Sequence, residues 1–330
     1  MADTLPDQMA AIEMTGAGGP EILSACRRPV PKPGPKEVLI KVTAAGVNGP
    51  DLMQRKGLYP SPKGASDLLG LEVAGEVVAL GSDSGQWAIG DKICALSNGG
   101  GYAEYCTVDA SHCLPIPDGV AETDAAGLPE TYFTIWSNIF MTAGLCAGEL
   151  FLVHGGAGGL GTTSVQLGKA FGAKVFATDS PEARCAVCRE LGADRVIDYE
   201  TQDFVEIVRE AGGANVILDI VGGPYIERNI KAAAPDGRIV QLAFALGSKA
   251  EINFMPIMLK RLVYTGSTLR SRPSAYKAEI AKQLVAKVWP LFGEGKLRTV
   301  TNHRVPLAEA TKAHEMMERA EHTGKILLII

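Results

Sequence analysis

The chain has no excess of positive charge and no long apolar run. Its 330 residues carry 32 Lys and Arg against 37 Asp and Glu, a formal net charge of −5. Without a basic excess, nucleic acid and anionic membrane surfaces are not expected as partners. No apolar run approaches the ~18 residues that a spanning helix needs, and residues 1–8 lack a basic-then-apolar targeting pattern. We therefore expect a cytoplasmic protein.

The chain contains cysteines, but their spacing does not indicate a disulfide framework. The seven cysteines are odd in number and irregularly spaced, which indicates reduced thiols. Cys185-x-x-Cys188 has the spacing of a redox or metal motif. It falls in segment 181–191, which is typical of a helix, and no second Cys pair or His pair accompanies it. We interpret both thiols as structural.

Two styles of sequence indicate two domains. Up to about residue 128 the segments are short, β-branched and interrupted by Gly and Pro, which predicts a β-rich domain. From about residue 130, strands and helices alternate, which predicts a doubly wound parallel sheet. The predicted strands are 151–154, 174–178, 195–197, 215–219, 238–242 and 262–269, and the first four connecting helices are 162–171, 181–191, 204–210 and 225–233. The last strand, 325–330, returns to the first style, so the predicted domains are 1–130 with 271–330, and 131–270.

The most specific local feature is Gly156-x-Gly158-x-x-Gly161, which lies between a predicted strand and a predicted helix. That context is required of a dinucleotide-binding loop. Gly156 would allow the tight turn, Gly158 would let the backbone approach a pyrophosphate, and Gly161 would let the helix pack on the strand. The second strand ends in Asp179, where a carboxylate can accept hydrogen bonds from ribose hydroxyls. The cofactor is expected beyond the carboxyl ends of the strands.

Several segments besides the glycine loop resemble those of one protein family. They are residues 45–52, 57–60, 70–75, 101–105, 191–194 and 268–272. Together they resemble the zinc-independent medium-chain dehydrogenases/reductases, and within them the quinone oxidoreductases of the branch that includes the p53-inducible enzyme. The resemblance implies a Rossmann domain plus a GroES-like β-rich domain, with the substrate in the cleft between them. It also implies a homodimer paired through the edge strand around residues 263–267.

The metal ligands of the zinc-dependent relatives are missing. Asn48 stands where those relatives have Cys, and Leu71 where they have His. A catalytic zinc needs three protein ligands, so we expect no metal mechanism.

The resemblance implies a set of site residues. Asn48 would donate its amide to the reduced quinone oxygen, although it could also be a turn residue before a helix. Tyr59 would donate a hydrogen bond or a proton to the substrate, or form an aromatic wall. Asp51 and Glu72 would hold the loop that carries Asn48. The predicted cofactor-binding residues are Thr134, Gly156, Ala157, Gly158, Gly159, Leu160, Gly161, Asp179, Ser180, Arg184, Tyr199, Phe244 and Lys325.

The sequence leaves the choice of cofactor open. The family usually uses NADPH, and Arg184 could clamp a 2′-phosphate. Asp179 would repel that phosphate unless its side chain turns away, and it permits NADH instead. We favour NADPH.

The predicted function is NAD(P)H-dependent reduction of a small quinone or activated carbonyl. One alternative is an enoyl-thioester reductase with Tyr59 as proton donor, for which Arg55, Lys56 and Lys63 could supply a basic channel. Another is a cofactor-binding sensor or nucleic-acid-binding module with little catalysis, which the net charge of −5 disfavours.

Overall fold

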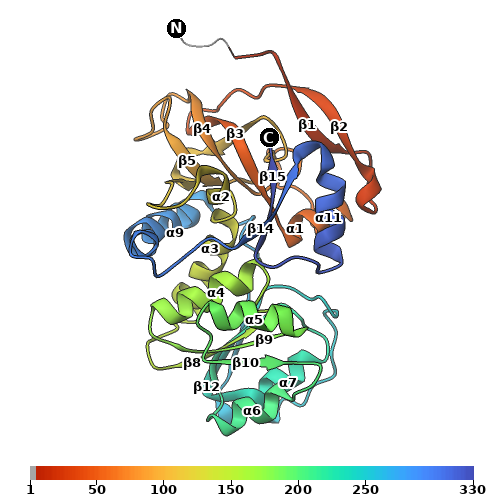
Figure 1. Cartoon of the computed structure of the whole chain (residues 1–330), viewed down its shortest axis with the longest axis vertical. Helices are drawn as coiled ribbons and strands as arrows, with labels where there is room; N and C mark the ends of the chain where they lie inside the picture. The colour runs from red at the N-terminus through yellow and green to blue at the C-terminus, as the bar shows by residue number, and fades with distance from the viewer. Residues whose placement is uncertain (1–4) are drawn as a thin grey trace. The chain divides into compact units, whose positions relative to one another are not determined.

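A computed structural model describes residues 5–330 (Figure 1). Half of the segment 1–8, interpreted above as lacking a targeting signal, lies outside the described residues. The chain divides into two compact units, Met1–Phe133 with Arg270–Ile330 (unit 1) and Thr134–Leu269 (unit 2). The divisions follow residues 133 and 269, whereas the predicted boundaries follow residues 130 and 270. Among residues 5–330, no helix is long and apolar enough to cross a bilayer.

Unit 1 is built on a seven-stranded sheet with the path β14-β15-β3-β4-β5-β7, and β6 pairs with β3 beside that path. Strands β14 and β15 are parallel, and the other pairs are antiparallel. A separate hairpin of β1 and β2 completes the strands. The strands are β1 Gln8–Met14, β2 Leu23–Pro29, β3 Glu37–Val47, β4 Glu72–Leu80, β5 Lys92–Leu96, β6 Tyr105–Asp109, β7 Cys113–Pro115, β14 Thr301–Pro306 and β15 Lys325–Ile329. The helices are α1 Gly49–Arg55, α2 Glu122–Ala125, α9 Ser274–Lys287, α10 Pro290–Gly293 and α11 Ala310–Glu318.

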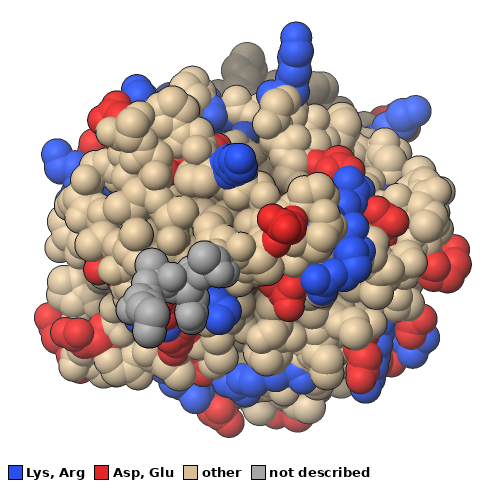
Figure 2. Space-filling model, turned by 90° about the horizontal axis from the view of Figure 1, so that it is seen from above, with Lys and Arg blue, Asp and Glu red and all other residues tan. Residues whose placement is uncertain are grey.

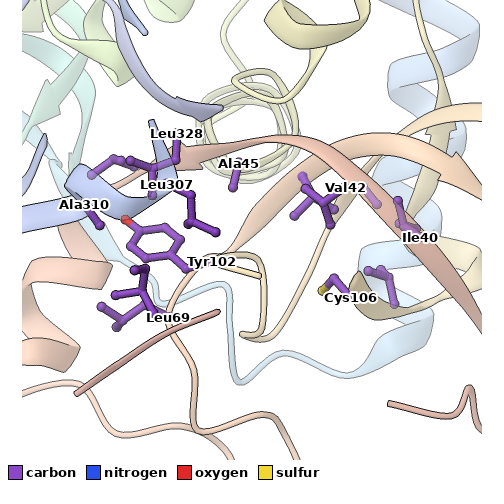
Figure 3. Packing of buried hydrophobic residues seen from close by; sticks show 14 of the residues in the cluster. Ile40, Val42, Ala45, Leu69, Tyr102, Cys106, Leu307, Ala310 and Leu328 are labelled. Atoms are coloured by element: carbon purple, nitrogen blue, oxygen red, sulfur yellow. The ribbon is translucent and has the colours of Figure 1, made fainter. Parts of the chain in front are cut away.

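The core of unit 1 joins residues from distant parts of the chain. Figure 3 shows the Tyr102 ring among Leu69, Leu307 and Leu328, and all four side chains are buried. Because β15 lies next to β3 in the sheet, the end of the chain is part of the same core as its beginning. The predicted return of the C-terminal strand to the β-rich domain is confirmed.

Unit 2 is a six-stranded parallel sheet with the order β10-β9-β8-β11-β12-β13. Counted within the unit, this is the 3-2-1-4-5-6 order of dinucleotide-binding folds, with the reversal between β8 and β11. The predicted fold class is confirmed. The strands are β8 Leu150–His154, β9 Lys174–Asp179, β10 Arg195–Asp198, β11 Ala214–Asp219, β12 Ala233–Gln241 and β13 Val263–Gly266. The helices are α4 Gly159–Ala170, α5 Glu182–Glu190, α6 Phe204–Glu210, α7 Tyr225–Ala232 and α8 Met255–Lys260.

The first of the two connections between the units is helical, and the second, at Leu269–Arg270, is not. Helix α3, Pro129–Ile135, is followed by a π-helical turn at Trp136–Thr142. The division between units falls inside α3, after Phe133.

Candidate active site

The glycine loop of unit 2 joins β8 to α4. Its glycines are required for two reasons, a backbone conformation with positive φ and close contacts that leave no room for a Cβ. Gly155 adopts φ +71°, so it makes the tight turn that we expected at Gly156. A Cβ on Gly156 would instead lie 2.7 Å from Cys188 Sγ, because α5 packs directly against the loop. A Cβ on Gly161 would lie 2.1 Å from the Gly155 carbonyl oxygen, so the first turn of α4 packs directly against the loop backbone. The contact is with the loop, and the predicted packing of Gly161 on the strand stays a prediction.

The first turn of α4 is the part of the loop suited to an anion. The helix begins at Gly159, three residues earlier than predicted, with Gly158 as its N-cap. Its first N–H groups, including those of Gly159 and Leu160, have no intrahelical acceptor. A Cβ on Gly158 would meet only the Gly155 oxygen, at 3.5 Å, which is an ordinary van der Waals contact, so this position has room for a small side chain. Such an end of a helix favours a phosphate group.

Asp179, at the end of β9, turns towards the loop. Its Oδ2 accepts from the Ala157 N–H at 2.7 Å, and its Oδ1 accepts from the Ser180 N–H at 2.9 Å. Arg184 Nε lies 2.6 Å from the same Oδ1, and the carboxylate is 3% exposed. Asp179 is therefore neutralised by an arginine and tied to the loop, instead of projecting freely. Ala157 is one of the predicted cofactor-binding residues, and its N–H is used inside the protein.

Ser180 is the exception in this well-bonded region. It is buried, and its hydroxyl oxygen has no hydrogen-bond partner in the structure. An unpaired buried hydroxyl costs about 1–3 kcal/mol, so a ligand atom is the natural partner.

The remaining predicted cofactor residues of unit 2 differ in exposure. Tyr199, just beyond β10, is 42% exposed, and Phe244, beyond β12, is 48% exposed. Thr134 is buried in α3, and its carbonyl accepts from Asn138 Nδ2 at 2.9 Å.

Unit 1 holds Asn48 in a buried polar cluster. The Asn48 N–H donates to Asp51 Oδ2 at 2.8 Å, and its Nδ2 donates to Glu72 Oε1 at 2.9 Å. Asp51 also accepts from the Gly70 N–H at 3.0 Å, and Glu72 from the Glu130 N–H at 2.8 Å. The predicted structural roles of Asp51 and Glu72 are confirmed. Burial raises the pKa of Asp51 to about 6, although the two N–H donors oppose the shift.

Lys325 belongs to this cluster. Its Nζ lies 2.6 Å from Glu72 Oε1, 2.5 Å from Asn48 Oδ1 and 3.2 Å from the Val47 carbonyl oxygen. An ammonium has three N–H donors, so these acceptors satisfy it. The structure gives Lys325 a different role from the cofactor contact that we expected: it fixes the Asn48 side chain.

These contacts bear on metal binding as well. Asn48 and the buried Leu71 are not metal ligands, and Glu72 already pairs with an ammonium. Across the part of the chain that the structure describes, no group of three or more His, Cys, Asp and Glu side chains could hold a metal ion. The residues do not fit a zinc site.

Tyr59 lies beyond α1 and is half-buried. The Arg270 guanidinium carbon is 5.7 Å from its ring centroid. Burial raises the pKa of the phenol, the Arg270 charge lowers it, and Glu130 raises it.

Two buried features of unit 1 were not predicted from the sequence, the Arg270 side chain and a cluster of three polar side chains. Arg270 lies in segment 268–272, but nothing in the sequence distinguishes it from Arg272. The other set is Arg55, His314 and Tyr102: His314 Nδ1 lies 3.3 Å from Arg55 Nη1, and its Nε2 lies 3.0 Å from the Tyr102 hydroxyl. Arg55 is fully buried and pairs with Glu318, so the prediction that it could line a basic channel is wrong.

The Cys185-x-x-Cys188 pair lies on α5, and both thiols are buried and free. Burial raises the pKa of Cys188 to about 12. The structural interpretation of the pair is confirmed, because the thiolate is the reactive form.

Comparisons with known proteins agree with this architecture. The alcohol dehydrogenase GroES-like domain matches residues 34–118, and the zinc-binding dehydrogenase domain matches residues 159–286. A quinone oxidoreductase of Pseudomonas aeruginosa is 32% identical over 327 residues, covering 96% of this chain and 98% of that protein. A mycocerosic acid synthase-like polyketide synthase of Mycobacterium tuberculosis is 30% identical over 300 residues, covering 90% of this chain; the chain spans only 14% of its length.

Solved structures show the same similarity. The Escherichia coli quinone oxidoreductase complexed with NADPH is 27% identical with a TM-score of 0.86, covering 97% of this chain and 100% of that one. The CurK enoyl reductase is 26% identical with a TM-score of 0.84, covering 98% and 99%.

The fold and the loop define a medium-chain dehydrogenase/reductase. Within that superfamily the chain belongs to the zinc-independent quinone oxidoreductase family.

Proposed function

We propose that the chain is an NAD(P)H-dependent quinone oxidoreductase that reduces a small quinone or activated carbonyl without a metal. The observation that carries the proposal is the N-terminus of α4, which has no side-chain cap at Gly158 and follows β8 at the strand-order reversal of the unit 2 sheet. The dinucleotide would supply a hydride. The 32% identity to the Pseudomonas aeruginosa quinone oxidoreductase supports the acceptor class.

The residues around β9 fit a dinucleotide, and they favour NADPH. Because Arg184 and the loop occupy both Asp179 oxygens, the carboxylate offers little to a ribose hydroxyl and little repulsion to a 2′-phosphate. The unpaired Ser180 hydroxyl would donate to that phosphate. The Escherichia coli relative was solved with NADPH. Tyr199 and Phe244 are partly exposed, and aromatic rings suit the flat parts of a dinucleotide.

On the acceptor side, Tyr59 would donate to the oxygen that gains negative charge. Asn48 would contribute through its second amide N–H, whose contact with the Gly46 oxygen is long at 3.4 Å and therefore easily exchanged. Lys325 and Glu72 hold the amide in that orientation.

Enoyl-thioester reduction is the alternative, favoured by the similarity to the CurK enoyl reductase. There Tyr59 would protonate the carbon skeleton. The burial of Arg55 removes part of the basic channel that a coenzyme A or carrier-protein substrate would need. Figure 2 shows basic and acidic side chains interspersed on one face of the molecule, with no broad field of one sign.

We also propose a homodimer paired through β13. This strand lies at the edge of the unit 2 sheet, as predicted. Apolar side chains are exposed there and on the preceding α8, among them Met258 at 67%, Leu259 at 65% and Val263 at 53%. A second copy can pair with an uncharged edge by two-fold symmetry and cover these side chains. Sedimentation should show a dimer for the wild type and a monomer for Val263→Lys; a monomeric wild type would refute the proposal.

The enzymatic proposal is tested by fluorescence titration with NADPH and NADH, followed by turnover with 1,4-benzoquinone and crotonyl-CoA. We expect tighter NADPH binding and quinone turnover. Ser180→Ala should weaken NADPH binding by about tenfold and leave NADH binding unchanged, since one charge-assisted hydrogen bond contributes about 1.5 kcal/mol. Turnover of crotonyl-CoA alone would establish the alternative, and equal effects of Ser180→Ala on both cofactors would refute the assignment of its hydroxyl.

A further inference from the structure

Arg270 is a buried cation whose charge is not compensated by a carboxylate in contact with it. Its Nε lies 2.9 Å from the Asn98 carbonyl oxygen, its Nη1 lies 2.6 Å from Gln54 Oε1, and its Nη2 lies 3.0 Å from Ser61 Oγ. All three acceptors are neutral, and Arg270 is 7% exposed. Within residues 5–330, no carboxylate forms an ion pair with it.

A second cation adds to the same positive region. Lys277 is 1% exposed, and its Nζ donates to Asn98 Oδ1 at 2.7 Å and to the Arg270 carbonyl oxygen at 2.8 Å. Burial and then the Arg270 charge lower the pKa of Lys277 to about 8, while Asp109 raises it. Two buried cations held by neutral acceptors are costly unless their field has a use.

Asp51 and Tyr59 both interact with the Arg270 charge, and the Tyr59 ring is the one that the guanidinium covers. The Tyr59 ring centroid is 5.7 Å from the Arg270 guanidinium carbon. Burial raises the pKa of the Tyr59 phenol and the Glu130 charge raises it further, whereas the Arg270 charge lowers it. Arg270 is therefore the charged group that favours the ionised form of this phenol.

We propose that Arg270 is a positioning residue of acceptor reduction, which acts through Tyr59 by stabilising the negative charge that develops on its hydroxyl. The inference rests on the proposed function. In the overall step the acceptor carbonyl gains a hydride from NAD(P)H, which is oxidised to NAD(P)⁺. The reduced oxygen takes a proton from Tyr59, and the tyrosinate regains one from solvent. Acceptors whose reduced oxygen is anionic, such as quinones, gain most from this arrangement.

A titration without cofactor or acceptor tests the electrostatic part. The protein is produced with fluorotyrosine, whose phenol ionises at lower pH than tyrosine, and the Tyr59 fluorine resonance is assigned with Tyr59→Phe. In Arg270→Gln the titration midpoint of Tyr59 should move to higher pH. Arg270→Lys, which keeps the charge, should leave it nearly unchanged. Arg272→Gln is the matched control, because that exposed arginine contacts the Tyr276 ring instead.

A double-mutant cycle on kcat tests the link to turnover. Tyr59→Phe should lower kcat by about 100-fold, the range of general-acid catalysis, and Arg270→Gln by about tenfold, from a unit charge at this separation. In the Tyr59→Phe background, Arg270→Gln should have no further effect, because Arg270 acts through Tyr59. A merely structural role would instead give factors that multiply.

The possible outcomes are distinct. An upward shift of the Tyr59 midpoint in Arg270→Gln but not in Arg270→Lys, together with non-additive losses of kcat, would support the inference. An unchanged midpoint or multiplying losses would overturn it. If the wild type reduces no quinone, the proposed function fails, whereas the fluorine titration still decides whether Arg270 controls Tyr59.

Discussion

Replacing Lys325 by Met should strongly destabilise unit 1. The ammonium is bound by Glu72, Asn48 and Val47, and the side chains of Lys325 and Glu72 are 9% and 0% exposed. Removing one partner of a buried ion pair costs about 3–5 kcal/mol, because the other charge remains buried. Glu72 keeps its hydrogen bonds from Asn48 Nδ2 and the Glu130 N–H, so we expect the lower end, about 3 kcal/mol.

Urea unfolding followed by tryptophan fluorescence measures this loss. In a Trp136→Phe background the remaining tryptophans, Trp87 and Trp289, both lie in unit 1, so the signal reports that unit. The double variant Lys325→Met/Glu72→Gln removes both charges and should recover more than half of the lost free energy of unfolding. A loss below about 1 kcal/mol for Lys325→Met, or additive losses in the double variant, would refute the description of this cluster.

Three further predictions follow from buried groups. Burial raises the Asp51 pKa from 3.8 to about 6, so the stability contributed by its protonated form is present below pH 3.8 and is lost as pH rises through about 6. Urea unfolding at a series of pH values should show this loss as a change of about 3 kcal/mol in the free energy of unfolding of the wild type, and Asp51→Asn should lack it. The same pH profile for both proteins would contradict the prediction. Gly161→Ala should lower the melting temperature because the new Cβ meets backbone atoms. Gly158→Ala should keep the wild-type melting temperature but bind NADPH more weakly. Equal melting temperatures for the two variants would contradict the packing argument. Iodoacetamide should modify the exposed Cys146 in the native protein and Cys188 only after unfolding, as mass spectrometry can show, and native labelling of Cys188 would be evidence against its burial.

The arrangement of unit 2 could be predicted because it depends on local patterns. Alternating strands and helices specify a parallel sheet, and the glycine spacing places the loop at the end of its first strand. The start of α4 was predicted too late because Gly159 and Gly161 are poor helix formers. The place of Gly161 in the first turn is set by its close contact with the loop backbone, and helix propensity does not include such a contact.

Side-chain partners that are distant in the sequence could not be predicted. Lys325 and Asn48 are 277 residues apart, and Arg55 and Glu318 are 263 apart. Each cation looks like an ordinary surface charge in the sequence and is buried only because its partner is supplied by another segment. The direction of Asp179 depends on the Ala157 N–H and on Arg184, and spacing along the chain does not encode it.

The order of segments along the chain has a consequence for synthesis. Unit 2 is contiguous, so all of its strands are synthesised before residues 270–330 are made. Unit 1 must wait for β15, which pairs with both β3 and β14 inside its sheet. Until then the β3 edge is open and part of the core beneath it is uncovered. We therefore expect unit 2 to complete its sheet first during synthesis, and unit 1 to complete its sheet only after β15 has been made.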